Sequence, residues 1–191
     1  AEGERAELTQ DGVDTARSNP GPDDGEIMRR PGLAGTRIVL SPRAVRPLYR
    51  HEVVVAAFAA ASNDEVLVMS ALGADPATLD GVRRQAADLG IEGRVRVLDR
   101  IDPDEIPDLY RAATVVVSVP ESDSFSVTLQ EAMATGVQVV AGEEYRRVSE
   151  ENRPRYAQGD DPHEITLTHD EVLILVEFFE RLEEKEQLRF E

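Results

Sequence analysis

Two short stretches of the sequence combine residue types that bind anions. The stretch SPRAVRPLYRH (41–51) holds Arg43, Arg46 and Arg50 directly after an apolar run, in a chain whose formal net charge is -17. Three guanidinium groups in one loop suit a phosphate or a diphosphate. Pairing with the many surface carboxylates is an equally good interpretation of this loop.

The second stretch, ESDSFSVTLQEAMATG (121–136), places small hydroxyl side chains at the start of an apolar helix pattern. The backbone amides of residues 126–128 would lie at the N-terminus of that helix, where unpaired N–H groups and the helix dipole attract anions. A simpler interpretation is that Asp123 or Ser124 only caps the helix. The stretch taken alone favours this simpler interpretation.

The segments around both stretches alternate between strand and helix patterns. Strands are predicted at 37–41, 65–70, 94–99, 114–120 and 137–142, and helices at 51–62, 75–90, 102–113 and 126–136. This alternation predicts an α/β fold over residues 37–142, with a doubly wound parallel sheet and right-handed crossovers. Ligands bind at the carboxyl ends of the strands in such sheets, and both stretches follow a strand.

Two of the predicted helices carry clear start signals. Asp75 can cap its helix, and Pro76 fits the first turn. Asp102 repeats this start, with Glu105 placed for a capping box, while Pro107 is expected to shift the helix start to a later residue.

The segments that flank the α/β region do not show the alternation of strand and helix patterns. Residues 1–36 are rich in Gly, Pro and charged residues, which predicts a linker or a loose arm. Residues 143–191 form a divergent tail, in which a polar linker precedes an amphipathic helix at 168–188 with a capping box at its start. The apolar face of this helix is expected to pack on the core, with a homodimer or partner contact as the alternative.

The composition excludes several functions. The chain has no cysteine, so disulfides and cysteine chemistry are excluded, and His51, His163 and His169 are too widely spaced for a local metal site. The negative charge repels nucleic acid and anionic membranes. No run of 18 apolar residues and no signal-peptide pattern occurs, so we expect a soluble cytoplasmic protein without a membrane span.

The basic residues are unusual in type. Of the 21 basic residues, Lys185 is the single lysine. Many carboxylates with almost no lysine resemble the composition of halophilic archaeal proteins, and an acidic protein from a GC-rich genome is the alternative interpretation. Neither GxGxxG after the first strand nor GxxxxGK[ST] is present, which argues against a dehydrogenase or a P-loop NTPase.

Several motifs together resemble one known family. The segments are TQDGVDTARSNP (9–20), RIVLSPR (37–43), RVRVLDRIDPDEIPDLYRAATVVVSVPES (94–122) and DSFSVTLQEAMATGVQVVA (123–141). In this order they resemble the C-terminal, donor-binding half of GT-B fold glycosyltransferases of group 1 (family 4, retaining). The resemblance implies the Rossmann-like half of a GT-B fold. It also implies a UDP- or GDP-linked sugar as the donor, with no cofactor and no metal.

The resemblance also implies roles for single residues. The family's two acidic residues separated by seven fall on Asp123, which would contact hydroxyls of the transferred sugar, and Glu131, which would bind the donor ribose. Arg43 matches the phosphate-binding arginine, and the backbone at Arg100 and Ile101 would frame the nucleobase. The diphosphate would lie against Ser124, Phe125, Ser126, Val127 and Thr128.

The sequence departs from the family pattern in ways that bear on activity. The loop after Arg43 lacks the lysine of the family's P-E-K-G context, so Arg46 or Arg50 would have to replace it. Ser124 and Ser126 replace a glycine pair of the family. Their side chains hinder the close approach of a ligand to the backbone. We also expect the acceptor-binding domain to be missing, so that the chain is a truncated half or works with a separate domain.

Two functions are compatible with these observations. The first is the donor-binding half of a retaining hexosyltransferase, which transfers a sugar from a nucleotide diphosphate sugar to an acceptor. The alternative is a catalytically inactive remnant that acts as an interaction module through helix 168–188.

Overall fold

A single parallel sheet organises the chain. The computed structural model describes residues 13–22, 26–61, 64–99, 101–122 and 126–142, and the backbone of residues 164–166. The strands are β1 (Ile38–Ala44), β2 (Val66–Ser70), β3 (Val95–Leu98), β4 (Ala113–Ser118), β5 (Gln138–Ala141) and β6 (Glu164–Thr166). They pair in the order β3-β2-β1-β4-β5-β6, parallel at every pairing. This order confirms the predicted doubly wound α/β fold, with its switch point between β1 and β4.

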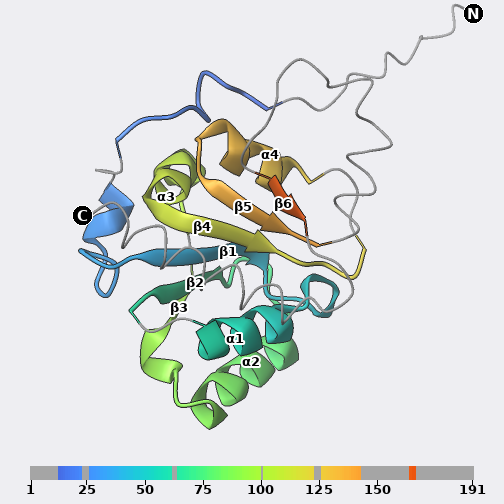
Figure 1. The fold of residues 1–191 in the computed structure, drawn as a ribbon. Coiled ribbons are helices and arrows are strands. Elements are labelled where there is room, and N and C mark those ends of the chain that lie inside the picture. Colours follow the sequence, from blue (N-terminus) through green and yellow to red (C-terminus); the bar gives the residue numbers. More distant parts are fainter. Residues whose placement is uncertain are drawn as a thin grey trace, which may run out of the picture.

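Helices cover both faces of this sheet (Figure 1). The helices α1 (His51–Ala61) and α2 (Pro76–Asp88) lie on one face, and α3 (Ile106–Ala112) and α4 (Val127–Ala134) lie on the other. Short 3-10 helices lie at Glu26–Arg29 (η1), Pro47–Tyr49 (η2), Glu92–Arg94 (η3) and Pro103–Glu105 (η4). Within the described ranges, no helix has the length and apolar character that crossing a membrane requires.

Alternate residues of the central strands enter two separate cores. On β2, Leu67 and Met69 belong to the core under α1 and α2, whereas Val66 and Val68 belong to the core under α3 and α4. All five residues of β2 are buried, as expected for a parallel strand with helices on both sides. The continuous apolar runs in the sequence therefore reflect burial on two faces rather than one.

The predicted helix starts are present in the structure. The carboxylate of Asp75 accepts a hydrogen bond from the backbone N–H of Thr78 (2.8 Å), and Pro76 begins α2. Asp102 and Glu105 form the predicted capping box around η4, so that α3 begins only at Ile106. The proline in the first turn of α3 lies where no backbone N–H is needed.

Two segments differ from the expectations. Residues 26–36 are not a loose arm, because Ile27 and Leu33 are fully buried in the core beside α3 and α4. The strand β6, which pairs in parallel with β5, was not predicted, because three residues are too few to show a period. The predicted helix 168–188 lies outside the described residues.

Candidate functional site

The candidate site lies where the chain leaves β1 and β4. These neighbouring strands lead to helices on opposite faces of the sheet, so that their following loops diverge at the ligand-binding edge. The two loops are joined by one backbone hydrogen bond, from the N–H of Glu121 to the carbonyl of Leu48 (2.9 Å). The topology therefore brings both anion-binding stretches of the sequence to one place.

Arg43, near the end of β1, contacts both η2 and the start of α4 through its side chain. Its Nη1 lies 3.1 Å from Oγ of Ser126 and 3.5 Å from Oγ1 of Thr128, both at the start of α4. Its Nη2 lies 2.5 Å from the hydroxyl of Tyr49, and its Cζ lies 4.3 Å from the centre of the Tyr49 ring. The guanidinium of Arg43, a residue of β1, is thus held at the N-terminal end of α4, the helix that follows β4.

The start of α4 has the features of an anion site. Ser126 is the N-cap residue, but its side chain makes no capping hydrogen bond and instead accepts from Arg43. Ser126 is 3% exposed, whereas Val127 in the first turn is 39% exposed. The N–H groups of the first helical turn and the positive end of the helix dipole lie beside the Arg43 guanidinium, and both favour a negatively charged ligand.

The other two candidate arginines are placed differently. Nε of Arg46 donates to the carbonyl of Gly73 (2.6 Å), in the loop after β2, and the Arg46 side chain is exposed. Arg50 has left-handed backbone angles (φ 49°, ψ 45°) between η2 and α1. The structure therefore brings Arg43 to the start of α4, and it holds Arg46 at a neighbouring loop.

Glu131 lies on α4, three residues after Thr128, at a spacing that places both on one face of the helix. Burial raises the pKa of Glu131, while the Arg17 charge and a hydrogen-bonding interaction with Tyr110 lower it. Tyr110 is 2% exposed. Its pKa is raised by burial first and then by the Glu131 charge, with an opposite effect of Arg43. Arg43 and Glu131 thus both act on Tyr110, which connects the two ends of the candidate site.

For the remaining predicted site residues, the structure gives little or no information on contacts within the site. The side chain of Ile101 is half-buried and packs against the core under α3 and α4. Asp123, Ser124, Phe125 and Arg100 lie outside the described residues. The predicted capping of α4 by Asp123 or Ser124 falls on the same segment.

The sequence analysis missed three residues of the site. Tyr49 contacts Arg43, and Tyr110 interacts with Glu131. In the sequence, Tyr49 was marked only by its place in the loop that holds the three arginines, and Tyr110 only by its place in a motif that resembles the family. His51, the first residue of α1, is fully buried, and among the described residues neither ring nitrogen has a hydrogen-bond partner of good geometry. Burial lowers the pKa of His51 to about 4, and the nearby backbone of Arg43 partly offsets this effect.

The acidic and histidine side chains of the described residues do not gather into a metal-binding cluster. In the part of the chain that the structure describes, no three His, Asp or Glu side chains are grouped so that they could hold a metal ion. The positive groups of the site are instead a guanidinium and helix N–H groups.

A doubly wound parallel sheet with helices on both faces defines a Rossmann-like α/β domain. Residues 23–159 match the sequence profile of the family described as glycosyl transferases group 1. The chain therefore belongs to this family.

Curated relatives of this chain are longer proteins. The chain is 30% identical over 150 residues to D-inositol 3-phosphate glycosyltransferase of Corynebacterium glutamicum, with 74% of this chain and 36% of the relative covered. It is 34% identical over 154 residues to the protein of the same name from Salinispora arenicola, with 72% of this chain and 34% of the relative covered. The chain thus spans about a third of the length of these relatives.

Solved structures share the fold. Anabaena Alr3699/HepE in complex with UDP-glucose superposes with a TM-score of 0.76 at 22% identity, over 92% of this chain and 47% of the other. The C-terminal domain of the group 1 glycosyl transferase LpcC from Francisella tularensis gives a TM-score of 0.70 at 20% identity, over 94% and 91% of the two chains. The second match shows that the chain shares the fold of that C-terminal domain.

Proposed function

We propose that this chain is the donor-binding half of a glycosyltransferase, and that it binds a nucleotide diphosphate sugar at the loops after β1 and β4. The observation that carries the proposal is the position of Arg43, whose guanidinium lies 3.1 Å from the N-cap hydroxyl of α4. A fixed cation beside the N–H groups of a helix start is suited to a diphosphate.

The same arrangement suits the chemistry of sugar transfer. When a glycosidic bond to a nucleoside diphosphate breaks, negative charge grows on the leaving phosphate, and the sugar becomes oxocarbenium-like. A preorganised guanidinium and helix dipole stabilise that growing charge without reorganising. We assign this role to Arg43 and the first turn of α4, and contact with the transferred sugar to Asp123.

Glu131 is proposed to bind the ribose hydroxyls of the donor. It lies on the same helix as Thr128, and a carboxylate can accept hydrogen bonds from two neighbouring hydroxyls at once. A UDP-linked sugar is the first donor to test, because the structural neighbour from Anabaena was solved with UDP-glucose.

Transfer itself is proposed only for a protein that also contains an acceptor-binding domain. The curated relatives carry the name D-inositol 3-phosphate glycosyltransferase, and this chain covers about a third of their length. The alternative function, an inactive remnant that binds partners through helix 168–188, has no support among the described residues, since that helix lies outside them.

Isothermal titration of the full chain with UDP, GDP, UDP-glucose and uridine, in high KCl, tests donor binding. We expect binding of a nucleoside diphosphate and much weaker binding of uridine, because Arg43 and α4 act on the phosphates. Absence of binding heat with every nucleotide would overturn the proposal.

A further inference from the structure

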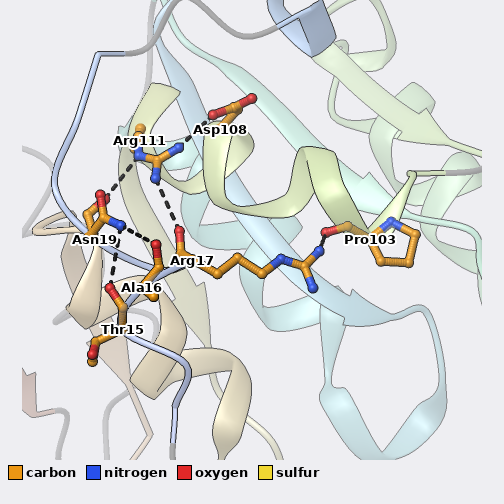
Figure 2. A network of polar contacts seen from close by, with 7 residues as sticks. All are labelled: Thr15, Ala16, Arg17, Asn19, Pro103, Asp108 and Arg111. Atoms are coloured by element: carbon orange, nitrogen blue, oxygen red, sulfur yellow. Dashed lines mark hydrogen bonds and ion pairs between the residues drawn. The ribbon is translucent and has the colours of Figure 1, made fainter.

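Arg111 and Arg43 both connect segments that lie far apart in sequence, but their partners differ in kind. Arg111, in the last turn of α3, donates to the carbonyls of Asn19 (2.9 Å) and Arg17 (3.2 Å). It also pairs with the carboxylate of Asp108 (2.6 Å), as Figure 2 shows. Carbonyls and carboxylates only accept hydrogen bonds, so this guanidinium is used to fasten the turn around Asn19 to α3.

Arg43 instead contacts three hydroxyl groups. Its Nη1 lies 3.1 Å from Oγ of Ser126 and 3.5 Å from Oγ1 of Thr128. Its Nη2 lies 2.5 Å from the hydroxyl of Tyr49. A hydroxyl that accepts from a guanidinium still has its own hydrogen to donate. Arg43 therefore lies among groups that can donate to an anion together with it, which the partners of Arg111 cannot do.

The hydroxyl of Tyr49 is held in place beside Arg43. Tyr49 is the last residue of η2, and its N–H donates to the carbonyl of Arg46 (3.0 Å). The carbonyl before it, of Leu48, accepts from the N–H of Glu121 in the segment after β4 (2.9 Å). Cζ of Arg43 lies 4.3 Å from the centre of the Tyr49 ring, where a cation is attracted to the ring face. Tyr49 is half-buried, and its hydroxyl hydrogen has no acceptor among the described residues.

We propose that Tyr49 is a further ligand-binding residue of the site, and that its hydroxyl donates to a phosphate oxygen of the ligand. The identity of this ligand rests on the proposed donor binding. A phosphate group has several strong acceptor oxygens, so it can accept from Nη2 of Arg43 and from the Tyr49 hydroxyl at once. Tyr49 thus acts at one terminal nitrogen of Arg43, while Ser126 and Thr128 act at the other.

This assignment replaces an expectation from the sequence. Arg46 or Arg50 was expected to supply a second phosphate-binding group in the loop after β1. The structure holds Arg46 at the carbonyl of Gly73 (2.6 Å), and Tyr49 is the residue of η2 that contacts Arg43. An uncharged hydroxyl adds a hydrogen bond to the phosphate without adding positive charge.

A direct contact with the ligand differs from a role in positioning Arg43, because it persists when the Arg43 side chain is replaced. The first test follows Tyr49 by NMR in the full chain labelled with 13Cζ-tyrosine, with the resonance assigned by Tyr49→Phe. Inorganic pyrophosphate, UDP and uridine are added to the wild type and to Arg43→Gln. We expect saturating pyrophosphate and UDP to shift the Tyr49 resonance in both proteins, and uridine to leave it in place. A resonance that moves only in the wild type would overturn the inference.

The second test measures pyrophosphate affinity in a double-mutant cycle. Tyr49→Phe should weaken binding by about 2- to 10-fold in the wild type and by a similar factor in Arg43→Gln, since one hydrogen bond to the phosphate is lost in each. Tyr156→Phe is the control for a hydroxyl lost elsewhere, and Arg83→Gln, an exposed arginine of α2, is the control for Arg43→Gln. If Tyr49→Phe has no effect once Arg43 is replaced, Tyr49 acts only through Arg43 and the inference is wrong.

Pyrophosphate also separates this inference from the proposed function. A chain whose pyrophosphate binding depends on Tyr49, but which binds no nucleotide, would support the role of Tyr49 and overturn donor binding. A chain that binds UDP equally well with tyrosine or phenylalanine at this position would support donor binding and overturn the inference. A chain that binds neither pyrophosphate nor a nucleotide would overturn both.

Discussion

Nη1 of Arg43 lies 3.1 Å from the hydroxyl of Ser126, although the two residues are 83 positions apart in sequence. The contact forms because β1 and β4 are neighbours at the switch point of the sheet, so Arg43 near the end of β1 meets Ser126 in the segment that follows β4. Ser126 occupies an N-cap position without capping, and its hydroxyl accepts from the guanidinium. The hydroxyl of Ser126 therefore positions the Arg43 guanidinium rather than capping α4.

Replacement of Arg43 is expected to weaken donor binding strongly. In Arg43→Gln, the site loses its charge beside the start of α4, and each hydrogen bond to a charged phosphate is worth about 1.5–3 kcal/mol. We expect a loss of about 10- to 100-fold in UDP affinity by isothermal titration, with Arg83→Gln unchanged. Arg43→Lys should recover only part of the affinity, because an ammonium lacks the planar fork. Wild-type affinity in Arg43→Gln would contradict this placement of the phosphates.

Tyr49 is expected to hold Arg43 in its position. The hydroxyl of Tyr49 lies 2.5 Å from Nη2 of Arg43, so Tyr49→Phe removes one hydrogen bond while the ring remains beneath the guanidinium. We expect UDP affinity to fall by about 2- to 10-fold, the size of a single net hydrogen bond. Uridine, which has no phosphate, is the internal control. A loss that is equal for UDP and uridine would show that Tyr49 does not act through the phosphate site.

Glu131 is expected to lower stability while it supports binding. Burial raises the pKa of Glu131, so the folded protein binds this proton more readily than the unfolded chain does. Above the folded-state pKa the carboxylate is ionised, and its burial then lowers the free energy of unfolding. Glu131→Gln should therefore have a higher Tm than the wild type at pH 7, and the difference should shrink as the pH falls toward about 4.5. The same variant should bind UDP more weakly. A lower Tm in Glu131→Gln at pH 7 would contradict this account.

Most of the fold could be predicted from the sequence because its signals are local. Buried parallel strands appear as continuous apolar runs, and the helix starts at Asp75 and Asp102 appear as residue types at fixed spacing. The burial of Ile27 and Leu33 could not be predicted, because short apolar positions among Gly and Pro show no period. Only the packing of that segment against α3 reveals it as part of the core.

The candidate site could be predicted in position but not in its contacts. The switch-point rule located the loops after β1 and β4, whereas the partners of each arginine depend on loop geometry. Arg46 extends to Gly73 instead of joining Arg43, and Tyr110 meets Glu131 across two helices. Such contacts join residues that are far apart in sequence, so no spacing pattern could reveal them.

Salt is expected to stabilise the protein, as the composition suggests. A formal net charge of -17 on 191 residues creates self-repulsion, which salt screens over about 10 Å at 0.1 M and about 3 Å at 1 M. We expect the Tm, measured by circular dichroism, to rise by several degrees between 0.1 and 2 M KCl, at about 2–4 °C for each kcal/mol. A sorbitol series of equal osmolality controls for excluded volume. A Tm that does not rise with KCl would remove the halophilic interpretation.

His51 is expected to make the protein sensitive to mild acid. Because burial lowers its folded-state pKa from 6.5 to about 4, the unfolded chain binds more protons between these pH values. The stability that the neutral ring confers is fully present above pH 6.5 and is lost as the pH falls toward 4, by about 3 kcal/mol in total. Urea unfolding of the wild type at pH 7 and pH 5 measures this loss.

The comparison variant for this experiment is His51→Phe, which keeps a flat ring in the buried position and cannot be protonated. Its free energy of unfolding should fall less than that of the wild type between pH 7 and pH 5, because the titration of other groups is common to both proteins. His163→Gln controls for the loss of an imidazole elsewhere in the chain. If the wild type and His51→Phe lose equal stability between pH 7 and pH 5, the prediction for His51 is wrong.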